Sequence, residues 1–483
     1  MSLKLVVIGA GPGGYLAAIR AAQLGARVTL VEQARVGGTC LHWGCIPTKT
    51  LKATAQALEE ARRLHEFGIT SAGQFQADLA AINARKQQVI DVQTQGIEKL
   101  LQAWGVELLR GRARLLGPRR VEVELTRGGG ACLEAERLIL ASGSRPADLP
   151  GLARDGVTVF NSDDALALKD IPGRLLIVGG GVVGCEFAFI YRALGSQVTL
   201  VEALERLLPM PSLDAEASRL LQREMKKRGI RVHLGRVVGE LRRGPDGLEA
   251  RLEPGPLLPQ PAGAKTPPPV TVPADKVLVS VGRALGSEDM GLAEAGLRLE
   301  RGAVQVDQRL AAGPEGVYAV GDVLGPGRPM LAHMAGAEAR VAAANALGAE
   351  LAVDYRVVPA VAFTTPEVAW VGLSPEQAAA QGLEAAAHVF QMRSLGKAQA
   401  MNELAGQCKL LSEKGSGRLL GAALVGARAS EMIHECALAL KLGATVADLA
   451  HTIHAHPTLS EAIAETAELA LGQCLHAPPL KKG

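Results

Sequence analysis

Residues 6–32, VVIGAGPGGYLAAIRAAQLGARVTLVE, have a second copy at residues 176–202, LIVGGGVVGCEFAFIYRALGSQVTLVE. The two segments align without a gap, and both end in VTLVE. Each has an apolar run, a glycine motif, a stretch with helical spacing and a final acidic residue. This order predicts a buried strand, a tight turn, a helix and a second strand, the beginning of a parallel α/β sheet, twice in one chain.

The glycines in each copy have the spacing of a dinucleotide-binding turn. They are Gly9, Gly11 and Gly14 in the first copy, and Gly179, Gly181 and Gly184 in the second. The first makes the turn, the second lets backbone approach a pyrophosphate, and the third lets the helix pack on the strand. Glu32 and Glu202, at the ends of the copies, can accept hydrogen bonds from an adenosine ribose. A single motif also fits a purely structural turn, but two complete motifs predict two cofactors that exchange electrons.

The second site is predicted to prefer NAD. A carboxylate at Glu202 repels a phosphate on the ribose 2′ position, and residues 203–205 carry no positive charge. Arg206 points the other way, because a positive charge can pair with the 2′-phosphate of NADP, so NADP remains the alternative.

A cysteine pair lies between the two copies, in GGTCLHWGCIPTK at residues 37–49. A zinc site would need more ligands than Cys40, Cys45 and the intervening His42, and no second paired motif follows. A structural disulfide is disfavoured because so short a loop restricts the unfolded chain little. A reducible disulfide at the start of a helix, whose dipole stabilises a thiolate, fits better. Redox exchange is therefore the preferred interpretation, with the other two left open.

Such an exchange needs a base, and HAHPTLSEA at residues 454–462 offers one. His456 precedes a proline, which favours an extended or turn conformation that can present the ring. Glu461 could hold one ring nitrogen while the other acts as the base. By itself a histidine before proline is usually a turn residue, so this assignment depends on the other motifs.

Length and composition limit the remaining possibilities. The 483 residues suggest about three domains. A net charge of +3 without a long basic block does not indicate nucleic-acid binding. No apolar stretch is long enough to span a membrane, and the start offers no signal-cleavage site, so we expect a cytoplasmic protein without a membrane span. Seven scattered cysteines argue against a secreted disulfide framework.

Four more segments organise the chain. LILASGSRP, residues 138–146, predicts a strand and turn that end the first dinucleotide domain. VYAVGDV, residues 317–323, predicts a buried strand ending at Asp322, where open α/β sheets bind ligands. Residues 254–273, dense in proline and glycine, predict a surface excursion between strands of the second domain. From about residue 350 the pattern is that of a separate α+β domain.

Together these motifs resemble the flavin- and NAD(P)-dependent pyridine nucleotide–disulfide oxidoreductases. The shared motifs occur in the family's order over almost the full length: GAGPGG, GGTCLHWGCIPTK, VGGGVVGCEF, VGR at 281–283, VYAVGDV, MLAH at 330–333, TTPEVAWVG at 364–372 and HAHPTLSEA. The resemblance implies an α/β fold with two Rossmann-like dinucleotide-binding domains, a central domain and a C-terminal α+β dimerisation (interface) domain. The implied ranges are 1–149 for FAD binding, 150–278 for NAD binding, 279–348 for the central domain that completes the FAD site, and 349–483 for the interface.

The resemblance also implies roles for single residues. Cys40 would face the substrate and Cys45 the flavin, with His456 as the base and Glu461 as its partner. Lys49 and Glu186 would lie beside the flavin ring, and Asp322 would bind its ribityl chain. Besides the glycines, the residues implied for FAD are Glu32, Thr39, Lys49, Ala113, Ser142, Glu186, Asp322, Met330, Leu331, Ala332 and His333. Besides the second set of glycines, those implied for NAD are Glu202, Val238 and Gly282.

The activity that the resemblance implies is oxidation of a protein-bound dihydrolipoyl group, with electrons passing through the Cys40–Cys45 disulfide and FAD to NAD⁺. The implied assembly is a homodimer with shared active sites that serves a lipoyl-bearing carrier protein or a 2-oxo acid dehydrogenase complex, without metal, nucleic acid or membrane. The alternatives are an NAD(P)H-dependent reductase of a glutathione-like disulfide and a mercuric-reductase-like enzyme. Glu202 argues against the first, and Cys474, which is unpaired in sequence, against the second. The chain departs from the family at LHW between the cysteines, at ALGSEDMGL after VGR, and at the insertion 254–273.

Overall fold

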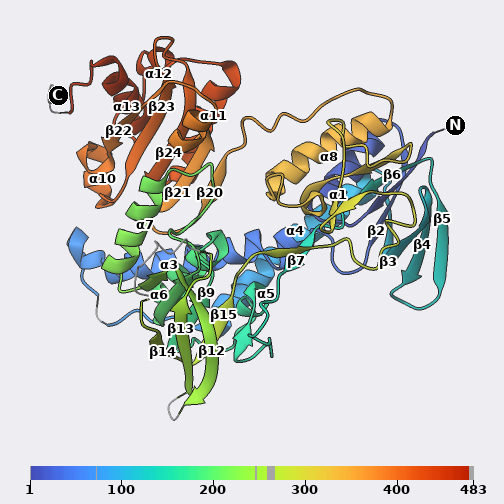
Figure 1. The fold of residues 1–483 in the computed structure, drawn as a ribbon, viewed down its shortest axis with the longest axis horizontal. Helices are drawn as coiled ribbons and strands as arrows, with labels where there is room; N and C mark the ends of the chain where they lie inside the picture. Colours follow the sequence, from blue (N-terminus) through green and yellow to red (C-terminus); the bar gives the residue numbers. More distant parts are fainter. Residues whose placement is uncertain (1, 72, 245–246, 258–266, 478–483) are drawn as a thin grey trace.

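A seven-stranded sheet contains the first sequence repeat (Figure 1). The computed structural model describes residues 2–71, 73–244, 247–257 and 267–477. In the sheet, β1 (Lys4–Ile8) lies parallel to β2 (Arg27–Glu32) and β6 (Arg137–Leu140), and α1 (Pro12–Gln23) connects β1 to β2. Four of the five residues of β1 are buried, because helices and other segments cover both faces of a parallel sheet. The first repeat thus forms the predicted strand, turn, helix and strand.

Segments distant in sequence complete the two edges of this sheet. On one side β3 (Glu107–Gly117) follows β2, and β4 (Arg120–Leu125) and β5 (Gly130–Glu134) continue it as an antiparallel meander. On the other side β19 (Val317–Ala319), from the VYAVGDV motif, lies parallel to β6. Residues after position 300 therefore complete the sheet that the N-terminus begins.

The second repeat forms a parallel sheet of its own, in the order β11-β10-β9-β15-β8. It begins with β9 (Arg174–Val178), α6 (Val182–Leu194) and β10 (Gln197–Glu202), and α7 (Ala215–Lys227) leads on to β11 (Arg231–Leu234). The remaining strands are β15 (Lys276–Val279) and β8 (Val159–Phe160). The match between β1-α1-β2 and β9-α6-β10 explains the internal repeat.

A small antiparallel sheet projects from this second unit. It contains β12 (Arg236–Gly244), β13 (Gly247–Pro254) and β14 (Val270–Ala274). The proline-rich segment lies at the connection between β13 and β14, as predicted, but the predicted range 254–273 is too long, because residue 254 belongs to β13 and residues 270–273 belong to β14. Residues 258–266 fall outside the described ranges.

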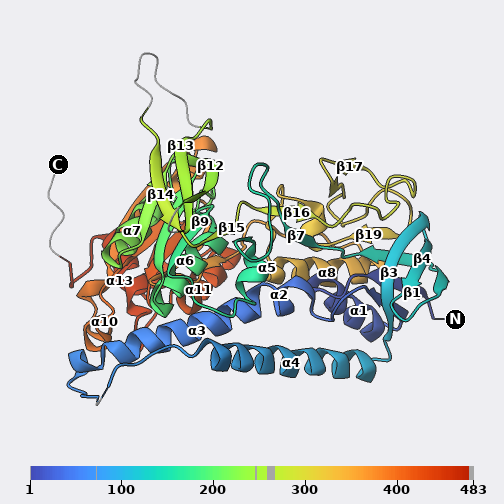
Figure 2. The same ribbon diagram turned by 90° about the horizontal axis from the view of Figure 1, so that it is seen from below.

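Two long helices run beneath both dinucleotide-binding units (Figure 2). The short α2 (Gly38–His42) is followed by α3 (Cys45–Arg62) and, after η1 (Leu64–Phe67), by α4 (Leu79–Ala103). α3 packs against α4 and also against α6 of the second unit. The first residue of α3 is Cys45, so the redox motif lies at the junction of the two units.

The C-terminal part has an antiparallel sheet with its own hydrophobic core. Its strands, in spatial order, are β20 (Ala360–Ala362), β21 (Glu367–Gly372), β24 (Leu419–Gly426), β23 (Gln407–Glu413) and β22 (Ala385–Gln391). The helices α11 (Ala429–Leu442) and α13 (Glu461–Leu471) pack on this sheet. The remaining C-terminal helices are α9 (Pro375–Ala380), η3 (Met392–Ser394), α10 (Gly396–Met401) and α12 (Val446–Ala450).

The remaining elements are β7 (Ser144–Pro146), α5 (Ser162–Ala165), β16 (Arg283–Leu285), β17 (Leu299–Glu300), β18 (Ala303–Val304), η2 (Gly321–Leu324) and α8 (Ala332–Ala346). Among them, α8 packs against α1 of the first unit, and α5 packs against β15 and β8 of the second. Within the described ranges, no helix is both long and apolar enough to cross a membrane. The predicted α/β class is confirmed, whereas the exact domain boundaries stay predictions.

Candidate active site

The two glycine motifs have the same hydrogen-bond arrangement. In the first, the Glu32 carboxylate accepts from the backbone N–H groups of Ala10 (2.6 Å) and Ala34 (2.7 Å). In the second, the Glu202 carboxylate accepts from the N–H groups of Gly180 (2.6 Å) and Leu204 (2.8 Å). Both carboxylates are buried at the carboxyl end of a central strand. Each is therefore fixed beside its glycine turn, where an adenosine ribose would be recognised.

The space around the glycines fits a pyrophosphate in both motifs. A Cβ added at Gly14 or Gly184 would collide with the carbonyl oxygen of Gly9 or Gly179, so only glycine lets the helix pack this closely. A Cβ at Gly181 would meet no atom within 4 Å, and at Gly11 only the Cα of Gly38 at 4.0 Å. The middle glycines thus leave the N-termini of α1 and α6 open to an anionic ligand.

Cys40 lies on the short helix α2, and Cys45 begins the longer helix α3 that follows it. Both are free, partly buried thiols. The hydrogen bond that Cys40 donates to Cys45 raises the pKa of Cys40, and burial raises it further. The same hydrogen bond lowers the pKa of Cys45 to about 7, and nearby Lys49 also lowers it. In the dithiol, Cys45 at the N-terminus of α3 is therefore the more acidic of the two thiols.

Lys49, one turn beyond Cys45, pairs with Glu186 from the second repeat. Its Nζ lies 3.0 and 2.8 Å from the two Glu186 carboxylate oxygens and 4.4 Å from the centre of the Phe363 ring. Glu186 also accepts a 2.9 Å hydrogen bond from the Phe363 backbone N–H. The Glu186 carboxylate is almost fully buried, whereas the Lys49 side chain is 32% exposed, so solvent screens the pair less than it would a surface pair.

Asp322 lies in a polar cluster at the carboxyl end of β19. It accepts a short hydrogen bond from Ser144 Oγ, and Arg283 Nε lies 3.7 Å from its Oδ2. Arg283 also donates to Ser144 Oγ (2.6 Å). The nearby Ser142 Oγ is buried and has no hydrogen-bond partner among the described residues. An unpaired buried hydroxyl beside the Gly9 turn fits a polar cofactor such as FAD.

The remaining residues predicted to bind cofactors are spread over several elements. Thr39 Oγ1 donates to the Ser144 carbonyl at 3.4 Å, and Ala113 is buried on β3. Met330 and Leu331 precede α8, and Ala332 and His333 begin it. The His333 ring forms a 2.8 Å hydrogen bond with the Pro359 carbonyl.

Two residues predicted to border NAD lie outside the glycine turn. Val238 is half-buried on β12, and Gly282 follows β15 with a φ of +123°. Arg206, the possible signal for NADP, donates to the carbonyls of Leu213 (3.0 Å) and Met210 (2.8 Å). Its guanidinium is thus held by the chain's own backbone.

His456 and Glu461 form the predicted pair on the C-terminal domain. His456 Nδ1 lies 2.8 Å from Glu461 Oε1, and the ring is 77% exposed. Although partial burial raises the pKa of Glu461, hydrogen bonds from the Thr458 N–H and from His456 hold it below the ordinary value. No hydrogen bond within the described residues joins His456 to either cysteine of the same chain, so the structure does not bring these predicted residues together.

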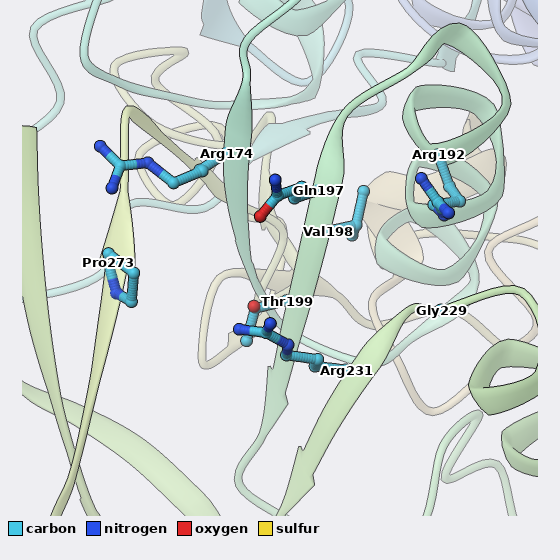
Figure 3. A pocket seen from close by; sticks show the side chains of 8 residues that line it. All are labelled: Arg174, Arg192, Gln197, Val198, Thr199, Gly229, Arg231 and Pro273. Carbon is cyan, nitrogen blue, oxygen red and sulfur yellow. The ribbon is translucent and has the colours of Figure 1, made fainter.

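A separate hollow of about 130 Å³ has three arginines in its lining (Figure 3). Arg174 and Arg231 begin β9 and β11, so the hollow lies at the end of the sheet opposite to the glycine turn. Arg174 is paired with Asp275 (2.6 Å), and Arg192 donates to the Arg228 carbonyl (2.6 Å). Figure 3 shows Arg174 and Arg192 on opposite sides of Gln197 and Val198, so these guanidinium groups do not converge on one ligand.

Several residues of the site were not predicted from the sequence. Ser144 and Arg283 lie inside motifs that were recognised, but neither was assigned a contact. The Phe363 N–H to Glu186 bond is a backbone contact without any sequence signal.

Two family descriptions match the chain. "Pyridine nucleotide-disulphide oxidoreductase" matches residues 3–339, and the dimerisation domain of the same family matches residues 358–467.

The chain belongs to the pyridine nucleotide-disulphide oxidoreductase family. As a member of this family it is a flavoprotein disulfide oxidoreductase that uses FAD and NAD. The match to the dimerisation domain supports a homodimer. The predicted family, fold class, enzyme class and cofactors are confirmed.

Curated relatives within this family share the full length of the chain. A protein of Thermus scotoductus named dihydrolipoyl dehydrogenase is 41% identical over 474 residues, with 98% of both chains covered. One of the same name from Bacillus subtilis is 37% identical over 473 residues, with 98% of this chain and 97% of the relative covered.

Solved structures of this family have the same fold. LpdA of Mycobacterium tuberculosis matches with a TM-score of 0.86 at 28% identity and covers 97% of this chain and 99% of its own. The HOCl-induced flavoprotein disulfide reductase RclA of Escherichia coli matches with a TM-score of 0.82 at 26% identity, over 96% and 99%.

Proposed function

We propose that the chain oxidises a protein-bound dihydrolipoyl group to its disulfide and passes the electrons through the Cys40–Cys45 pair and FAD to NAD⁺. The observation that carries this proposal is the placement of the cysteine pair: Cys45 is the first residue of α3, where a helix N-terminus stabilises a thiolate, and Lys49, one turn further on, pairs with Glu186. The full-length relatives named dihydrolipoyl dehydrogenase support the choice of substrate.

The proposed reaction begins with the Cys40–Cys45 disulfide. A dihydrolipoyl thiol gives its proton to His456 of the partner subunit, and the resulting thiolate attacks Cys40 Sγ. The Cys40–Cys45 bond breaks, and Cys45 leaves as a thiolate, which its low pKa favours. The substrate is now joined to Cys40 by a mixed disulfide.

The second lipoyl thiol completes the exchange. It attacks the lipoyl sulfur of the mixed disulfide, the bond to Cys40 breaks, and Cys40 receives the proton that this thiol gives up. The lipoyl group departs as a disulfide, and the enzyme holds two electrons as the Cys40 thiol and the Cys45 thiolate. When bound, FAD supplies the two-electron transfer that carries them to NAD⁺ and restores the cysteine disulfide.

His456 and Glu461 fit the role of base and orienting partner. Glu461 holds Nδ1 at 2.8 Å, so the other ring nitrogen, Nε2, is left to take a proton. The ring is largely exposed on the domain that matches the family's dimerisation domain, which suits a base supplied to the other chain of a homodimer. We therefore assign each active site to both chains.

We assign FAD to the first glycine motif and NAD to the second. Glu32 and Glu202 would each bind an adenosine ribose, Asp322 and Ser142 would face FAD, and the Lys49–Glu186 pair would lie beside the reacting end of the flavin. Glu202 and the occupied Arg206 support NAD over NADP. We propose four domains. Residues 1–149 bind FAD, residues 150–278 bind NAD, residues 279–348 complete the FAD site, and residues 349–483 form the dimer interface.

The proposed partner is a lipoyl-bearing carrier protein or a 2-oxo acid dehydrogenase complex. We propose the cytoplasm as the location, because seven cysteines scattered over the chain do not form the paired framework of a secreted protein.

One experiment separates this proposal from its alternatives. The purified protein is examined for bound flavin and assayed with dihydrolipoamide and NAD⁺, with NADPH and glutathione disulfide, and with NADPH and Hg²⁺. We expect bound flavin and activity with the first pair. NADPH-dependent reduction of glutathione disulfide or Hg²⁺ without lipoamide activity would overturn the proposed substrate.

A further inference from the structure

A carboxylate is buried in the helix that follows the MLAH motif. Glu338 is 2% exposed, and its neighbours on the buried side of α8 are mostly alanines. Burying a carboxylate is unfavourable unless hydrogen bonds replace its water. The groups that bind Glu338 therefore indicate what it does.

Both oxygens of Glu338 have a donor. Oε2 accepts from the backbone N–H of Gly321 at 2.7 Å, and Oε1 accepts from the Tyr355 hydroxyl at 2.7 Å. Arg328 Nη1 donates to the same Tyr355 hydroxyl at 2.5 Å, and the Arg328 guanidinium lies 5.0 Å from the centre of the Tyr355 ring. Burial raises the pKa of Glu338, although these hydrogen bonds favour its charged form. Glu338 thus connects α8 to the turn at residue 321 and to Tyr355, and Tyr355 in turn connects it to Arg328.

This junction connects the two segments that approach FAD in the proposed function. Gly321 directly precedes Asp322, and α8 begins at Ala332, within the MLAH motif. A bond from Gly321 to Glu338 therefore fixes the Asp322 turn relative to the first turn of α8. Without it, both segments could still fold, but their relative position would be less strictly defined.

We propose that Glu338, oriented by Tyr355, is a positioning residue that holds the Asp322 turn against the start of α8 and thereby sets the affinity for FAD and its reduction potential. This inference rests on the proposed function, in which both segments contact FAD. It adds a connection between the flavin site and residues 353–359, the segment that leads into the C-terminal sheet.

The same helix offers a matched control. Asn345 is also buried and also binds backbone: its Nδ2 donates to the carbonyls of Arg309 (2.9 Å) and Leu351 (2.8 Å), and its Oδ1 accepts from the Leu351 N–H (2.8 Å). It touches neither Gly321 nor Tyr355 by any described hydrogen bond. Loss of Asn345 should therefore weaken the fold without moving the Asp322 turn.

The test measures FAD affinity and potential in full-length variants. Apoprotein is titrated with FAD by flavin fluorescence, and the potential is measured against a reference dye. We expect Glu338→Ala to raise the FAD Kd about ten- to a hundredfold, the range for loss of a buried hydrogen bond to a charged group, and to shift the potential. Glu338→Gln, which keeps an acceptor for Gly321, should restore much of the affinity. Tyr355→Phe should raise the Kd by a smaller factor, and it carries the test if Glu338→Ala does not fold.

The controls separate this inference from the proposed function. Asn345→Ala should lower the melting temperature and leave the FAD Kd and potential unchanged. Equal effects of Glu338→Ala and Asn345→Ala, or no effect of Glu338→Ala and Tyr355→Phe, would overturn the positioning role while leaving the proposed function intact. An Asp322→Ala protein with unchanged FAD affinity would overturn the assignment of Asp322 and the inference with it.

Discussion

The Nζ of Lys49 lies 2.8 Å from Oε2 of Glu186, and this ion pair joins the helix of the redox cysteines to the helix of the second glycine motif. The two residues are 137 positions apart in sequence. Lys49 also lowers the pKa of Cys45, so one amine balances a buried carboxylate and a thiolate. The charge of the redox site therefore depends on both dinucleotide-binding units.

Replacing Lys49 should make the Cys45 thiol less acidic. In Lys49→Met the cation is lost, and we expect the pKa of Cys45 to rise from about 7 toward the ordinary thiol value. In the wild-type dithiol, the rate of Cys45 alkylation should fall as the pH drops through about 7, because the thiolate is the nucleophile. Mass spectrometry of the Cys45 peptide over a pH series measures this midpoint.

Lys52→Met is the control for that measurement. Lys52 lies on the same helix and pairs with Glu367 at 3.1 Å, so its replacement also removes a paired cation. An equal rise of the midpoint in both variants would show a general charge effect and contradict the role of Lys49.

Loss of the proposed base should slow thiol oxidation without loss of FAD. We expect His456→Gln to lower kcat with dihydrolipoamide by about 10²- to 10⁴-fold, the usual contribution of a positioned base. His476→Gln is a matched control, because His476 is likewise exposed and pairs with a glutamate, Glu465, at 2.6 Å. A near-normal rate for His456→Gln in stopped-flow reduction by dihydrolipoamide would remove it as the base.

The carboxylate of Glu202 should determine the choice of pyridine nucleotide. Glu202→Ser removes the group that repels a 2′-phosphate, so we expect kcat/KM for NAD⁺ to fall and that for NADP⁺ to rise, narrowing their ratio by at least about tenfold. Glu205→Gln removes an exposed carboxylate three residues away and should leave the ratio unchanged. If the ratio of kcat/KM for NAD⁺ to kcat/KM for NADP⁺ is unaltered in Glu202→Ser, Glu202 does not determine the preference for NAD⁺.

A buried ion pair between the second unit and the C-terminal sheet should matter for stability. Lys409 on β23 binds Asp214 and Glu216 at the start of α7, and both Lys409 and Asp214 are about nine-tenths buried. Lys409→Met leaves these carboxylates without their cation, so we expect a loss of about 3–5 kcal/mol in the free energy of unfolding. Lys414→Met, at an exposed site on the same domain, should cost less than about 0.5 kcal/mol. Denaturant unfolding of both variants at equal subunit concentration tests this, and equal losses would contradict it.

Local sequence was sufficient for the repeated units. The glycine spacing, the apolar runs and the terminal acids predicted β1-α1-β2 and β9-α6-β10, because each unit spans fewer than about thirty residues and its contacts are mostly local. The position of Cys45 at a helix start followed in the same way from a short motif that ends in Pro47 and Lys49.

These local patterns could not predict contacts between segments that are distant in sequence. The sequence alone determined that the chain has two dinucleotide folds, a redox cysteine pair and a distant histidine with its glutamate. Only the tertiary structure decided that Glu186 pairs with Lys49, that Glu338 accepts a hydrogen bond from Gly321 beside Asp322, and that the His456 side chain is largely exposed. The physical reason is that periodicity and spacing report which face of one element is buried, whereas a side chain's partner depends on how whole units pack against each other.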